Sequence, residues 1–324
     1  MCLKKWLFPA AAACSGVLAL LLLTCGNTAA QGVRDGISLC LASVIPALFP
    51  FFVAAQLLTA LGAAEVLGRA AGPLFRRLFG IDGAGAAAFL LGLLGGYPVG
   101  AKAAGSLVRQ GLLSPEDGAR LLTFCNNAGP SFIFSIAGVG VFGSQKIGLA
   151  LYGIHILSAL AAGGLLDGLR SVRNVSKTAG SDMKTARCDM KPASNCMKSA
   201  GNGTKLPALF VSCVGSAAAA MVNICAFVIF FLVVMTLVRQ AWPGLPPLAL
   251  GLLELTGGIT SLEASPAGFC MAAALLGWGG VSVHCQTAAV LEDTGLSLRR
   301  YLLAKALQAV ISALFALGLC CFSL

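Results

Sequence analysis

Charged residues are scarce in this sequence of 324 residues: Asp, Glu, Lys and Arg together make up 10% of it, and histidine occurs twice. None of the 13 cysteines belongs to a Cys-x-x-Cys pair, and most lie inside apolar runs, where cysteine acts as a small hydrophobic residue. Neither a disulfide framework nor a zinc site is therefore expected.

The recurrent motifs of enzymes are missing as well. The sequence has no metal-ligand spacing, no Gly-x-Ser-x-Gly elbow with a matching triad and no glycine-rich loop ending in Gly-Lys-Ser/Thr for phosphate. We therefore predict that the chain is not an enzyme, and we assign it no cofactor and no metal.

Apolar residues are abundant instead, at 58% of the chain with a mean hydropathy of +0.89. This composition predicts an all-α polytopic membrane protein whose partner is the lipid bilayer. Runs long enough to cross a bilayer predict about six full transmembrane helices, at residues 6–26, 37–61, 118–142, 147–169, 208–238 and 300–322. The first run also resembles a secretory signal, and we favour an uncleaved span.

Positive charge is concentrated in one polar segment. Residues 170–205 hold eight Lys or Arg against two Asp, and so contribute six of the net ten positive charges. We predict that residues 170–206 form a basic, disordered cytoplasmic linker between a first membrane half (1–169) and a second (207–324). A solvated loop explains the basicity without nucleic acid as a partner.

Two apolar stretches, residues 84–112 and 267–296, are interrupted by glycines in the middle. The first contains GGYPVGAK, with Lys102 inside what would otherwise be a span. We predict that both are re-entrant helical hairpins, because unwound backbone is tolerated at membrane depth only where protein or a water-filled cavity satisfies it.

A third interruption is expected at residues 118–142. Ser114 and Pro115 are typical of a helix start, and the helix then meets CNNAGPS, in which Pro130 removes a backbone donor. We predict a helix broken within the membrane, with a simple proline kink as the alternative.

The two hairpin stretches also align with each other without a gap at an offset of 184 residues. Identical residues recur at positions 91, 95, 96, 99, 104, 107, 111 and 112 of the first stretch. We infer an internal repeat, inverted or parallel, and interrupted segments at matching positions in two halves point to a transporter's binding site.

Polar residues at these breaks are candidates for binding an anion. Lys102 falls in the first turn after the glycines, where free N–H groups and the helix dipole also favour negative charge. The second stretch offers Ser282, His284 and Gln286, and His284 either couples to protons or is a hydrogen-bonded interior histidine. Glu254 and Thr256 lie in apolar surroundings, so we predict a coupling ion or proton there, with a structural pairing of Glu254 to Lys102 or Arg239 as the alternative.

The segments GGYPVGAK, SPEDGARLLTFCNNAGPSFI, ELTGGITSL and GGVSVHCQTAAVL together resemble the YlbJ-like sporulation integral membrane proteins. These belong to the nucleoside-recognition, or Gate, domain proteins, which are similar in plan to concentrative nucleoside transporters. The resemblance implies transport of dipicolinate, a small dicarboxylate, across the mother-cell-derived outer forespore membrane.

Carried over to matching positions, the resemblance implies binding residues at Tyr97, Lys102, Asn126, Asn127, Ser131, Glu254, Thr256, His284 and Gln286. The alternatives are a nucleoside-type transporter and a non-transporting scaffold for spore envelope assembly. The sequence leaves open whether the chain forms a homo-oligomer.

Overall fold

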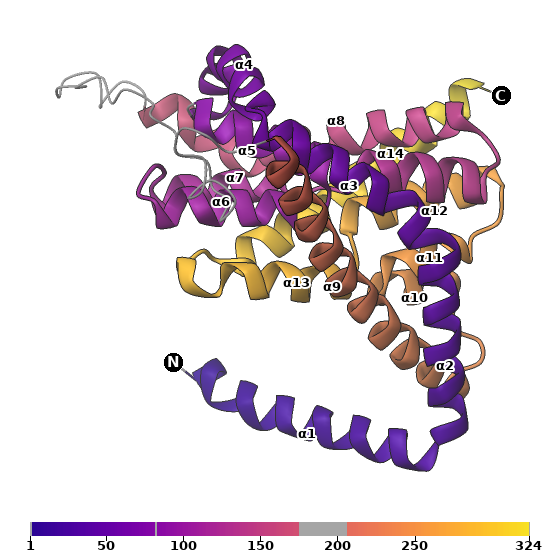
Figure 1. The fold of residues 1–324 in the computed structure, drawn as a ribbon. Coiled ribbons are helices and arrows are strands. Elements are labelled where there is room, and N and C mark those ends of the chain that lie inside the picture. Colours follow the sequence, from indigo (N-terminus) through magenta and orange to yellow (C-terminus); the bar gives the residue numbers. More distant parts are fainter. Residues whose placement is uncertain (1, 82, 175–205, 324) are drawn as a thin grey trace.

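The computed structural model describes residues 2–81, 83–174 and 206–323, and within these ranges the chain is built from helices and short connections, with no strand (Figure 1). The predicted all-α membrane fold is confirmed. Most of the predicted basic linker, residues 175–205, lies outside the described residues, and its first residues continue a helix as far as Asn174.

The first half contains α1 (Cys2–Thr24), α2 (Gly26–Leu39), the π-helical η1 (Cys40–Val44), α3 (Ile45–Ala60), α4 (Ala63–Phe79), α5 (Gly83–Gly95), α6 (Val99–Arg109), α7 (Pro115–Cys125), the π-helical η2 (Phe132–Val141) and α8 (Gln145–Asn174). The second half contains α9 (Leu206–Ala241), α10 (Pro247–Leu253), α11 (Leu255–Thr260), α12 (Pro266–Trp278), α13 (Val281–Leu291), the 3₁₀ turn η4 (Glu292–Thr294) and α14 (Leu298–Ser323).

By length and composition, five helical segments within the described residues can cross a membrane: Gly26–Ala60, Gln145–Leu166, Leu206–Ala241, Pro266–Thr294 and Leu298–Cys321. A sixth is possible if α4 and α5, which meet at a bend of 103°, count as one span. A total of five or six is consistent with the predicted six, but its membership differs. The predicted span 6–26 is not among these segments, and Ala12–Thr24 forms a shorter apolar helix there. The predicted span 118–142 is divided into α7 and η2, and residues 267–296 fall mainly in one candidate span rather than in a confirmed hairpin.

Small residues let the helices approach closely. Gly32 and Gly36 of α2 face α9, where an added Cβ would lie 2.8 Å from Val233 Cα and 2.9 Å from Ile229 Cα respectively. Gly277 of α12 meets the backbone of α14 in the same way, with Ala309 Cα at 2.8 Å. Because lipid offers no hydrophobic drive for helix association, such close van der Waals contact is what holds membrane helices together.

Helix starts are determined locally by serine caps. Ser114 Oγ accepts a hydrogen bond from the Asp117 N–H at the start of α7, and Ser265 Oγ accepts one from the Gly268 N–H at the start of α12. A proline follows each serine at the first helical position. The same signal therefore begins an interrupted segment in each half of the chain.

Candidate functional site

Helix is interrupted inside the buried body of the described chain at four places that concern the site: residues 96–98 between α5 and α6, residues 126–129 between α7 and the helix resuming at Pro130, Glu254 between α10 and α11, and residues 279–280 between α12 and α13. We call these together the break junction. Each break is followed by a helix N-terminus, whose free N–H groups carry partial positive charge.

Two of the breaks are tips of folded-back helix pairs. A Cβ added to Gly92 would lie 2.9 Å from Gly100 Cα, and one added to Gly258 would lie 2.2 Å from Gly251 Cα. In a continuous helix, residues seven or eight apart are separated by about 10 Å or more. The pairs α5–α6 and α10–α11 therefore fold back on themselves, each crossing at a glycine–glycine contact.

The other two breaks interrupt the segments that begin at the serine caps. Residues 126–129 separate α7 from η2, and residues 279–280 lie inside the candidate span Pro266–Thr294. Each half thus contains a folded-back pair followed by a broken segment. The predicted repeat, which paired residues 84–112 with 267–296, is not confirmed, since α5–α6 is matched in shape by α10–α11.

The breaks lie against one another. A Cβ added to Gly96 would be 2.9 Å from Gly129 N, so the α5–α6 tip touches the unwound backbone of the α7–η2 break. The Tyr97 hydroxyl donates to Leu276 O at 3.2 Å, and a Cβ on Gly279 would lie 3.0 Å from that hydroxyl. The α12–α13 break in turn lies against the Glu254 break, since a Cβ added to Gly280 would lie 3.0 Å from Leu255 N.

One face of α14 lines this junction with polar side chains. Tyr301, Lys305, Gln308 and Ser312 follow at intervals of four, three and four residues, and all are at most 1% exposed. This spacing places them on one side of a helix. The ammonium group of Lys305 donates to Asn126 O at 3.0 Å and to Gln308 Oε1 at 2.6 Å, and it lies 5.2 Å from the centre of the Tyr97 ring.

Asn126 joins three elements at the junction. Its Nδ2 donates to Thr287 Oγ1 at 2.9 Å and to the Tyr301 hydroxyl at 3.1 Å, while its Oδ1 accepts from the Ala101 N–H at 3.3 Å. The Tyr301 hydroxyl lies 3.2 Å from Nδ1 of His284, whose ring also packs edge-on against Trp278. The break at residues 126–129 is therefore hydrogen-bonded to α6, α13 and α14.

His155 of α8 satisfies a further backbone group of the break. Its Nε2 accepts from the Ala128 N–H at 3.0 Å, and Gln308 Nε2 donates to His155 O at 3.2 Å. Beyond it, the Ser312 hydroxyl donates to the Ser158 hydroxyl at 2.7 Å. The hydrogen-bonded network thus continues from His284 through α14 to α8.

Three buried side-chain nitrogen or oxygen atoms among the described residues have no hydrogen-bond partner: Asn127 Oδ1, Ser131 Oγ and His284 Nε2. Asn127 is fully buried, and Ser131 and His284 are each 8% exposed. Buried polar groups are nearly always paired, since an unpaired one costs about 1–3 kcal/mol. All three belong to the broken segments and had been predicted as binding residues, and they suit a polar ligand.

Glu254 acts as a helix cap in this structure. Its carboxylate accepts from the Thr256 N–H at 3.0 Å and from the Gly257 N–H at 2.6 Å, at the first turn of α11. Both Glu254 and Thr256 are buried. Their predicted role in ion or proton coupling stays a prediction.

The structure separates Lys102 from the network. Lys102 is exposed on α6, whose opposite side buries Ala101 and Ala104. Ser282 and Gln286 are buried on α13, in the same helix as His284. The buried lysine of the junction is Lys305, which was not among the predicted binding residues. The repeated spacing of polar residues at 301, 305, 308 and 312 inside a predicted span was the available signal.

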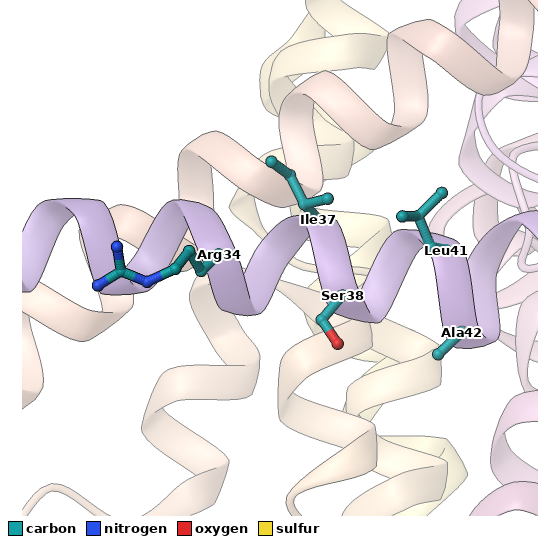
Figure 2. Close-up of a pocket in the computed structure, with 5 residues that line it drawn as sticks. All are labelled: Arg34, Ile37, Ser38, Leu41 and Ala42. Atoms are coloured by element: carbon teal, nitrogen blue, oxygen red, sulfur yellow. The ribbon is translucent and has the colours of Figure 1, made fainter.

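A hollow of ≈ 520 Å³ lies away from the junction. It is lined by Arg34, Ile37, Ser38, Leu41 and Ala42, all from one continuous helix, and Figure 2 shows these side chains leaving that helix in different directions. Ile37 and Leu41 are 44% and 63% exposed. Such a face of a candidate span suits lipid contact and does not gather polar groups around a ligand.

A smaller pocket of ≈ 220 Å³ lies beside the Glu254 cap. Gly257, Thr260 and Ser261 of the α11 region form one wall, and α2 and α9 contribute Asp35, Thr236 and Arg239. This pocket adjoins the Glu254 break and lies outside the buried hydrogen-bonded network.

Comparison with known proteins agrees with the motif resemblance. Residues 41–145 match the Gate family model, described as nucleoside recognition, and this range includes α5–α6 and the α7–η2 break. The chain is similar to the sporulation integral membrane protein YlbJ of Bacillus subtilis (strain 168), at 25% identity over 311 residues, covering 89% of this chain and 76% of that protein. No solved structure matches. These similarities confirm the predicted resemblance.

Proposed function

We propose that this membrane protein is a transporter for a small carboxylate, most specifically dipicolinate moved across the mother-cell-derived outer forespore membrane during sporulation. The similarity to a sporulation membrane protein supports the setting, and the Gate match supports a transporter-like role. The site is the break junction, where interrupted helices from both halves meet.

The observation that carries the proposal is a buried lysine amine with no acidic partner, at the same junction as three unpaired polar atoms. In the part of the chain that the structure describes, the contacts of the Lys305 ammonium are neutral oxygens and a ring face. A buried charge in a membrane protein is normally paired. A carboxylate arriving at the junction supplies that countercharge, and the free atoms of Ser131 and His284 offer hydrogen bonds to it.

Dipicolinate uptake into proteoliposomes that contain only this chain tests the proposal. Wild-type vesicles should show saturable uptake, and Lys305→Met should lose at least about 10-fold, because a lost interaction with a charged group costs about 1.5–3 kcal/mol. The exposed Lys146 provides a matched control, and Lys146→Ala should behave as wild type. Absence of dipicolinate uptake in well-folded wild type would exclude the proposed substrate.

Lys102→Ala belongs in the same experiment, because the sequence predicts Lys102, in the first turn after the glycines, as a residue that binds the substrate's negative charge. If Lys305 provides that charge, Lys102→Ala retains most of the uptake, since its side chain is exposed outside the network. Loss in Lys102→Ala combined with uptake in Lys305→Met would assign the carboxylate to the α5–α6 tip instead.

A nucleoside substrate is the second candidate, because the matching family model is described as nucleoside recognition. A neutral nucleoside has no negative charge to pair with the Lys305 ammonium, so it should depend on Lys305 much less than a carboxylate does. Competition of labelled dipicolinate uptake by unlabelled nucleosides, with nucleoside uptake that survives in Lys305→Met, would favour this candidate over the carboxylate.

A further inference from the structure

The carbonyl of Asn126 has lost its helical partner for a reason visible in the sequence. In a continuous helix it would accept from the N–H of the residue four positions later. That residue is Pro130, which has no N–H. Asn126 is 1% exposed, so this carbonyl is shielded from bulk water, and the Lys305 ammonium reaches it at 3.0 Å.

The remaining neighbours of the ammonium resemble the ligands of a monovalent cation. Gln308 Oε1 lies 2.6 Å from Nζ, and the Tyr97 ring centre lies 5.2 Å away. Carbonyl oxygens and aromatic faces are the groups that bind Na⁺, K⁺ or an ammonium ion away from water. Lys305 itself enters from α14, a different element from the break that it binds.

Transporters with discontinuous helices use unwound carbonyls at such breaks to coordinate Na⁺. We propose that the Lys305 ammonium occupies a monovalent-cation site formed by the α7–η2 break, as a cation tethered to α14, so that this break needs no inorganic cation. For transport, which rests on the proposed function, the consequence is that a Na⁺ gradient is not the driving force at this site.

Removal of the side chain distinguishes a tethered cation from a merely structural lysine. Truncating it leaves the carbonyl and amide oxygens facing an opened space, which a free cation of suitable size can enter. An uncharged side chain of similar length keeps that space filled. The two substitutions Lys305→Ala and Lys305→Met therefore separate the alternatives, and Lys146→Ala controls for the loss of an exposed lysine.

The experiment measures the thermal unfolding midpoint of the purified full chain in detergent, in choline chloride and in NaCl, KCl or methylammonium chloride of equal ionic strength. Wild type and Lys146→Ala should unfold at the same temperature in all four salts. Lys305→Ala should unfold lower in choline and recover by several degrees in at least one small cation, because ligand binding to the folded state raises stability by mass action. Lys305→Met should not recover.

Two results would overturn the proposal: stabilisation of wild type by Na⁺ as large as that of Lys305→Ala, or a folded Lys305→Ala that no cation stabilises. Where Lys305→Ala does not accumulate, binding of radioactive sodium to wild type decides the question. Stoichiometric binding that Gln308→Leu abolishes would mean that an inorganic cation is still required there, because Gln308 Oε1 is the side-chain oxygen of the site, and no binding supports the tethered cation. None of these measurements uses a substrate, so failure of the dipicolinate proposal would not affect them.

Discussion

In the first half, backbone groups freed at residues 126–129 are bound by side chains from distant elements, Lys305 of α14 and His155 of α8. In the second half, Glu254 caps the helix that follows its own break. The α7–η2 break is therefore coupled to the packing of α8 and α14, whereas the Glu254 break is capped by its own side chain. A movement of α14 would disturb the α7–η2 break and leave the Glu254 cap of α11 intact.

The two halves resemble each other most in their glycine crossings, and the largest expected effect comes from filling them. An added Cβ on Gly100 would lie 2.0 Å from Cys125 O, and one on Gly258 would lie 2.2 Å from Gly251 Cα. Because backbone atoms cannot move aside, Gly100→Leu and Gly258→Leu should each abolish accumulation of folded protein, measured by size-exclusion chromatography of detergent extracts.

Gly153→Leu is the size-matched control, since an added Cβ there meets nothing within 4 Å. It should accumulate as wild type does. Folded Gly258→Leu would show that the α10–α11 crossing tolerates a side chain, and the likeness between α5–α6 and α10–α11 would then be superficial.

Asn126 distinguishes the halves next, because its side chain connects the α7–η2 break to α6, α13 and α14. Asn126→Ala leaves the Ala101 N–H without its acceptor and removes a donor from Thr287 and Tyr301. We expect a loss of about 2–4 kcal/mol in unfolding free energy, measured by denaturant titration in mixed micelles. The exposed helical Asn27 gives the control Asn27→Ala. A loss of unfolding free energy no larger than that of the control would mean that the α7–η2 break does not depend on these contacts.

Much of the fold follows from composition and apolar run length, which is why the number of spans and the helical class were predictable. The break after Cys125 was also predictable, because Pro130 removes a donor and leaves a local signature. In the second half the hairpin was predicted at residues 267–296, whereas the pair that folds back at Glu254 is α10–α11. Its signal was the tetrapeptide Leu-Gly-Leu-Leu, which precedes both tips, at residues 91–94 and 250–253.

The site itself was predicted only in part. Asn127 and Ser131 were predicted from the resemblance, and His284 also from its place in an interrupted segment. Each carries an unpaired atom in the structure, and their role in binding stays a prediction. Lys305 was missed and Lys102 preferred, because sequence shows that a lysine lies in an apolar segment but not toward which side of the helix it points. That direction is determined by packing between helices remote in sequence.

Glu254 tests the second half, where the cap is local and the expected effect is smaller. Glu254→Ala removes the acceptor of two N–H groups and should cost about 1–2 kcal/mol in unfolding free energy. Glu254→Asp keeps a capping carboxylate and should recover most of it. If Glu254→Gln unfolds as wild type does but no longer supports uptake in proteoliposomes, the carboxylate carries an ion or proton, and capping is not its main role.

The smallest effect is expected at the far end of the network, where Ser312 and Ser158 pair at 2.7 Å between α14 and α8. Ser158→Ala, Ser312→Ala and the double variant form a cycle whose coupling energy should be about 0.6 kcal/mol, the average for such bonds between membrane helices. Unfolding free energies in mixed micelles measure it. Suppose that the α7–η2 break depends on how α14 packs against α8. The Ser158–Ser312 coupling energy should then be larger in wild type than in an Asn126→Ala background, because Asn126→Ala already loosens α14 from the break. Equal coupling in both backgrounds would show that the serine pair and the break are energetically independent.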